Sequence, residues 1–185
     1  MELATTIWNT CLRTNTRLHL TYIPSAINPA DPPSRQMATQ IEWKIDQQYY
    51  QQLEQLWGTH NVDCFASQEN HQTDKYFSWK WDPQSLSTNA FLTPWNRWKR
   101  VFLCPPWNLL PRCLQHLNQH PTKATIITPN WPSAIWYPLL LSMTKEPPLL
   151  VPSTMIHPSL RGDDLLTKNQ QWELLAWNIN GKDLN

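Results

Sequence analysis

The order of apolar and polar positions along the chain divides it into alternating strand and helix segments. Short apolar runs typical of buried strands lie at 61–66, 101–104, 123–128 and 149–151. Apolar residues at helical spacing predict helices over 46–57, 109–117 and 133–143, between those strands. A last alternating segment at 172–177 is predicted to be a strand, antiparallel to the others. This order predicts an α/β fold of the Rossmann-like type, with a mostly parallel sheet and helices on both faces.

The first part of the chain has a different pattern. Residues 2–14 predict a helix, residues 18–23 a strand, and residues 25–35 form a proline-rich loop. This unit contains too little apolar surface to fold alone. We therefore expect three parts, namely a helix–strand unit at 1–36, a linker with a helix at 37–58, and the main domain at 59–185.

The centre of the pattern is the run from Val101 to Cys104, which leads directly into Pro105 and Pro106. A strand cannot continue through two prolines, because each ring removes a backbone donor and fixes φ near −65°. The strand is therefore expected to end at Cys104 and to present Trp107 on a rigid segment. Ligands of open α/β sheets bind at the carboxyl ends of strands, so this segment is a candidate site.

Composition restricts the class of protein only slightly. The chain has 185 residues and a net charge of +1, which gives no whole-protein argument for a polyanionic partner. Its four cysteines form no close pair, which is typical of reduced thiols in an intracellular protein, cytoplasmic or nuclear. The sequence shows no secretory leader and no run of apolar residues long enough for a membrane span.

The sequence Cys104-Pro105-Pro106-Trp107 resembles the Asn/Asp-Pro-Pro-aromatic motif of methyltransferases that modify the DNA adenine amine. The upstream run Val62–Asn70 and the downstream run Ile126–Trp136 resemble the Dam-like branch of that family. The resemblance implies that these four residues form the catalytic site, with the aromatic ring stacked on a flipped base. It also implies an S-adenosylmethionine site. The residues expected at that cofactor site are Asp63, Phe65, Ala66 and Asn70.

Two features of the sequence depart from this family. Cys104 stands where the family has Asn or Asp, and a thiol is only a weak hydrogen-bond acceptor. No glycine occurs between Gly58 and Gly162, so the glycine-rich turn that usually holds the cofactor is absent. We therefore expect a methyltransferase-like fold with degenerate catalysis. The alternatives are an active adenine methyltransferase, and a non-catalytic structural module or pseudogene fragment.

The segment Asn28–Arg35 resembles the end of the RNase H domain of retroelement polyproteins, where Asp31 would be the last metal-binding carboxylate. One carboxylate cannot hold two metal ions, so we expect no RNA cleavage by this chain and predict no metal site. The order of the two resemblances matches the polyprotein of DIRS-like, tyrosine-recombinase retrotransposons. It implies an upstream polymerase and RNase H part as partner.

A small basic and aromatic cluster precedes the central strand. Aromatic rings beside cations suit the binding of a nucleic-acid strand, because bases stack on the rings and phosphates pair with the cations. Ordinary surface cations beside a strand are the alternative interpretation. The sequence thus predicts a nucleic-acid-associated accessory domain that contacts DNA or RNA. The residues of the cluster are Trp95, Arg97, Trp98, Lys99 and Arg100.

Overall fold

The computed structural model describes residues 2–17, 19, 44–144, 146–157 and 173–180. The chain divides into two units, Met1–Met37 and Ala38–Asn185. In the first unit the predicted helix is confirmed as α1, Glu2–Arg13. The predicted strand at 18–23, except His19, and the loop with Asp31 lie outside the described residues.

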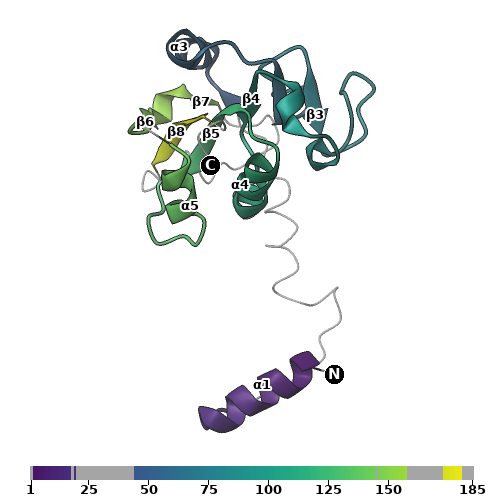
Figure 1. Cartoon of the computed structure of the whole chain (residues 1–185), viewed down its shortest axis with the longest axis vertical. Helices are drawn as coiled ribbons and strands as arrows, with labels where there is room; N and C mark the ends of the chain where they lie inside the picture. The colour runs from purple at the N-terminus through teal and green to yellow at the C-terminus, as the bar shows by residue number, and fades with distance from the viewer. Residues whose placement is uncertain (1, 18, 20–43, 145, 158–172, 181–185) are drawn as a thin grey trace. The chain divides into compact units, whose positions relative to one another are not determined.

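The second unit is built on a mixed sheet of six strands (Figure 1). Its order is β3-β2-β4-β5-β8-β6. Strands β3, β2, β4 and β5 run parallel to one another, whereas β8 is antiparallel to both β5 and β6. The predictions of a mostly parallel sheet and of an antiparallel final strand are confirmed. The strands are β2 (Val62–Ala66), β3 (Tyr76–Ser78), β4 (Arg100–Leu103), β5 (Lys123–Pro129), β6 (Leu149–Val151) and β8 (Leu174–Asn180).

Two helices cover one face of the sheet, α4 (Leu110–Gln119) and α5 (Tyr137–Ser142). Pro111 lies in the first turn of α4, where its missing N–H costs no hydrogen bond. Alternation along β4 sends Val101 and Leu103 into the core on this face, and both are fully buried. Burying a side chain of this size contributes about 1.5–3 kcal/mol.

The opposite face is covered by α3 (Gln47–Trp57) and by a two-stranded antiparallel sheet of β1 (Lys44–Ile45) and β7 (Ile156–His157), as Figure 1 shows for α3. Phe102 of β4 points to this face and packs with Tyr50 and Leu53 of α3. Residues 44–57, expected as part of a linker with a helix, are therefore a layer of the main domain, because their apolar side chains complete its second core.

The ends of α3 are those that the sequence predicts. Asp46 caps its start, with Oδ1 accepting from the Gln48 N–H at 2.7 Å. Gly58 ends it with φ at +99°, a region that side chains with a Cβ rarely adopt. His60 and the start of β2 follow directly after Gly58.

The long connection at 67–98 contains β3 and two short 3₁₀ helices. Trp95 anchors it, because its ring is fully buried and its Nε1–H donates to the Ala90 carbonyl at 3.0 Å. Among the described residues, no helix combines the length and the apolar character needed to cross a membrane. Among the described residues of this unit, the 3₁₀ helices are Ala90–Leu92, Trp95–Arg97, Trp107–Leu109 and Ser153–Met155.

Candidate functional site

The predicted segment at the carboxyl end of β4 is largely packed into the domain. The strand ends at Leu103, and Trp107 begins a short 3₁₀ helix after the two prolines. The Trp107 ring is half-buried and meets the Trp131 ring edge-to-face, with 5.1 Å between the centroids. Burial raises the pKa of the Cys104 thiol well above its usual range. The thiol therefore stays protonated and is a poor partner for a substrate amine.

Asp63 lies beside this segment on the neighbouring strand β2, and its side chain is enclosed. The residue is 2% exposed, and its carboxylate accepts from the Phe65 and Gln72 N–H groups at 3.2 Å each. Burial raises the pKa of Asp63 to about 7, against the opposing effect of these two hydrogen bonds. The Gln72 amide also donates to the Ile45 carbonyl at 2.7 Å. Asp63 thus ties the loop after β2 to the second core.

The other residues expected at a cofactor site have structural contacts. Phe65 packs against Phe91 and Trp95, and Ala66 is buried in the sheet. The Asn70 side chain closes a turn by accepting from the Ser67 N–H at 2.6 Å. Neither of the two cavities described below is lined by Asp63 or by these three residues. The expected S-adenosylmethionine cleft therefore has no counterpart in either cavity.

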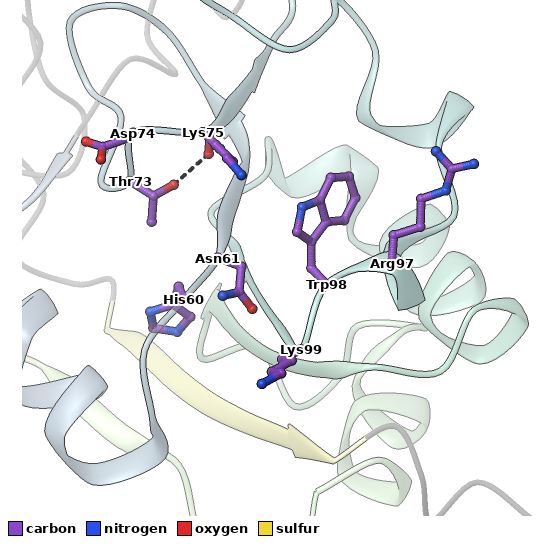
Figure 2. Close-up of a pocket in the computed structure, with 8 residues that line it drawn as sticks. All are labelled: His60, Asn61, Thr73, Asp74, Lys75, Arg97, Trp98 and Lys99. Atoms are coloured by element: carbon purple, nitrogen blue, oxygen red, sulfur yellow. Dashed lines mark hydrogen bonds between the residues drawn. The ribbon is translucent and has the colours of Figure 1, made fainter.

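The larger of the two cavities lies at the opposite end of the same strands. Its volume is about 470 Å³. The residues that line it stand immediately before β2, β3 and β4, and parallel neighbours bring their amino ends to one edge of the sheet. They are His60, Asn61, Thr73, Asp74, Lys75, Arg97, Trp98 and Lys99 (Figure 2).

Three of the five residues of the predicted basic and aromatic cluster belong to this cavity, namely Arg97, Trp98 and Lys99. Lys75 adds a third cation and Asp74 an anion, so the lining carries a net positive charge. The Trp98 ring is half-buried, and its edge-to-face contact with Phe77 at 5.6 Å fixes its position. Its carbonyl accepts from the Thr122 hydroxyl at 2.7 Å.

The other two residues of the predicted cluster lie elsewhere. Trp95 is 0% exposed and its ring lies 4.4 Å from that of His116, so it offers no surface to a base. Arg100 is 6% exposed, and its Nη1 donates to Asn178 Oδ1 at 2.9 Å beside a smaller cavity of about 290 Å³. We therefore remove both from the candidate surface, because burial and internal hydrogen bonds already occupy them.

A buried hydrogen-bond chain forms the back of the larger cavity. His60 Nε2 lies 2.7 Å from Thr125 Oγ1, and Nδ1 lies 3.1 Å from the Tyr50 hydroxyl. That hydroxyl donates to Glu54 Oε1 at 3.1 Å. Burial lowers the pKa of His60 to about 4, so the ring is neutral at physiological pH. The ring lines the cavity as a neutral group and is not a cationic contact.

Sequence reasoning missed His60, Asn61 and Lys75. These residues stand at the starts of strands, and that position was the signal that could have found them. It was not used, because ligands of open α/β sheets are expected at the carboxyl ends of strands and not at the amino ends. Asn61 joins two of these ends, because its Oδ1 accepts from the Arg100 N–H at 3.0 Å. Within the described residues, no group of three or more His, Cys, Asp or Glu side chains is placed to hold a metal ion.

Comparisons of the chain with protein-family models, with curated proteins and with solved structures gave no match.

Proposed function

We propose that this chain is a nucleic-acid-binding accessory domain that does not itself catalyse methyl transfer. The observation that carries the proposal is the cavity at the amino ends of β2, β3 and β4, where Trp98 stands among three cations. Lys75, Arg97 and Lys99 are all exposed, and they belong to the two segments that precede β3 and β4. The proposed partner is DNA or RNA.

Each part of the cavity supports a different part of strand binding. The cations pair with phosphates and release bound counterions, which gives a binding constant that falls as salt rises. The half-buried Trp98 ring offers a stacking surface that does not depend on base identity. A volume of about 470 Å³ is in the range of small-ligand pockets and suits one nucleotide of a longer strand.

The carboxyl end of β4 supports a loss of catalysis. A protonated Cys104 thiol is a weak acceptor for an exocyclic amine, and Asp63 is buried beneath the loop that follows β2. We propose that the domain keeps a methyltransferase-type arrangement without the cofactor site. The resemblances around Asn28–Arg35 and Cys104–Trp107 further support an origin in a retrotransposon polyprotein, beside a polymerase and RNase H part.

The test is binding of a fluorescently labelled single strand of about 16 nucleotides, as DNA and as RNA, measured by anisotropy across a salt series. The triple variant Lys75→Ala, Arg97→Ala and Lys99→Ala is expected to bind at least about tenfold more weakly. Its salt slope should fall by about 2, because each lost phosphate contact removes about 0.7 for single strands.

The control is Arg13→Ala, which removes an exposed arginine from α1 in the other unit. Its affinity and salt slope should match those of the wild type. If the triple variant binds as tightly as Arg13→Ala, or if the wild type does not bind either nucleic acid, the proposal is wrong.

A further inference from the structure

The loop after β3 exposes two tryptophans that the cavity does not include. Trp79 is 77% exposed and Trp81 is 81% exposed, and Lys80 lies between them in the sequence. Large aromatic rings are usually well buried, because their apolar area is costly to leave in water. Two such rings in one short segment mark a contact surface.

Hydrogen bonds hold this loop in place. The Ser78 hydroxyl donates to the Lys80 carbonyl, and the Leu86 N–H donates to the Tyr76 carbonyl at 2.8 Å. The Tyr76 hydroxyl donates to Asp82 Oδ2 at 2.6 Å. The backbone that carries the two indoles is thus tied at both ends to β3. A backbone that is already ordered adds little to the entropy cost when the side chains it carries bind a partner.

One exposed cation lies between the two indoles, and further cations lie at the other end of β3. The cation is Lys80, and the nearby Asp82 carboxylate, which keeps its charge, accepts from the Tyr76 hydroxyl and from the Gln84 N–H at 2.9 Å. Lys75, which lines the cavity, directly precedes β3, and Trp79 directly follows it. Four residue steps along a strand span about 13 Å. A single nucleic-acid strand bound at the cavity could therefore also contact the loop.

We propose that Trp79 and Trp81 form a base-stacking platform for single-stranded nucleic acid, with Lys80 contacting a phosphate. This inference rests on the proposed function and specifies it, because it makes the single strand the preferred form. The faces of bases are free in a single strand and are covered by neighbouring pairs in a duplex. The cavity supplies most of the charge, and the loop supplies most of the stacking.

The experiment uses the full chain with the double variant Trp79→Ala and Trp81→Ala. Its affinity for a strand of about 16 nucleotides should fall at least about tenfold, with the salt slope unchanged. The variant Trp79→Phe and Trp81→Phe should recover most of the affinity, because a phenyl ring still stacks. The control Ile135→Ala, which truncates a side chain that is 91% exposed, should bind like the wild type.

Binding of duplex DNA gives a second measurement. The double alanine variant should bind duplex DNA as the wild type does, so that the preference for single strands disappears. If it retains wild-type affinity for single strands while the triple cation variant does not, the platform is overturned and the cavity proposal stands. If the wild type binds no single strand at all, both fail. If the affinity falls equally for duplex and single strand, the stacking inference is also wrong.

Discussion

The two ends of β2 and β4 carry different side chains and are packed differently. At the carboxyl ends, Trp107 meets Trp131 and Asp63 is sealed under a loop. At the amino ends, Arg97 and Lys99 remain exposed around a cavity of about 470 Å³. Open α/β sheets usually bind ligands at the carboxyl ends of their strands. Here the residues expected at the carboxyl ends of β2 and β4 are largely packed, whereas the cationic cavity lies at the amino ends.

Side chains of the same type have different roles in this protein, depending on whether their neighbours bury them. Trp95 and Trp98 are three residues apart, yet the first belongs to the core and the second lines the cavity. The same division separates Arg100 from Lys99. A residue suited to nucleic-acid contact therefore takes part only where the fold leaves it open to solvent.

The largest expected effect is that of Trp95→Ala, which tests the division within the amino end. Removing this fully buried ring should lower the free energy of unfolding by about 3–5 kcal/mol, because it leaves a cavity beside His116. Trp98→Ala should cost less than half as much and should weaken strand binding instead. Urea denaturation and anisotropy measure the two effects. Equal losses of stability would remove the distinction between core and cavity tryptophans.

The pH dependence of stability should show opposite contributions from the two regions. Burial lowers the pKa of His60 from 6.5 to about 4, so the unfolded chain binds more protons in this window and stability rises with pH. Burial raises the pKa of Asp63 from 3.8 to about 7, so the folded chain binds more protons and stability falls as pH rises through it. The two contributions oppose each other between about pH 4 and 6.5 in the wild type.

Single substitutions should reveal each contribution. In Asp63→Asn, stability should rise with pH from about 4 to 6.5, and in His60→Gln it should fall with pH from about 4 to 7, each by up to about 1.4 kcal/mol per pH unit. Urea titrations at several pH values measure these slopes. Identical pH profiles for the two variants would show that neither group has the burial described here.

Trp107→Ala tests the carboxyl end directly. The ring is half-buried in contact with Trp131, so its loss should lower the free energy of unfolding by about 1–2 kcal/mol. The affinity for single-stranded nucleic acid should stay within about twofold of the wild type, since the cavity lies at the other end of the sheet. Anisotropy measures this affinity, and Arg97→Ala serves as the comparison, because it should weaken binding. A tenfold weaker complex for Trp107→Ala would place the binding surface at the segment after β4.

The smallest effect is expected from Cys104→Asn, which restores the residue type of the adenine methyltransferase motif. Transfer of a labelled methyl group from S-adenosylmethionine to DNA should stay at background, because Asp63 beside it is enclosed. Calorimetry with S-adenosylmethionine should give no heat for the variant or for the wild type. Methylated adenine in the variant alone would show that only the thiol prevents catalysis.

Much of the fold could be predicted because it follows from local patterns. The run from Val101 to Leu103 ends where two prolines remove the backbone donors, and Gly58 ends the helix after Asp46 with a positive φ. The helix within 44–57 was predicted, but its packing against the sheet was not, since an amphipathic pattern does not say which face of a sheet a helix will cover.

The sequence by itself determined the strands β2, β4, β5, β6 and β8, the helices between them, and the grouping of Arg97, Trp98 and Lys99 near one strand. It did not predict the short strands β1, β3 and β7. Only the tertiary structure decided that Trp95 and Arg100 are buried, and that His60 and Lys75 join the same cavity. The physical reason is that exposure depends on neighbours far apart in the sequence. Parallel pairing brings the starts of β2, β3 and β4 together, and no local pattern encodes that meeting.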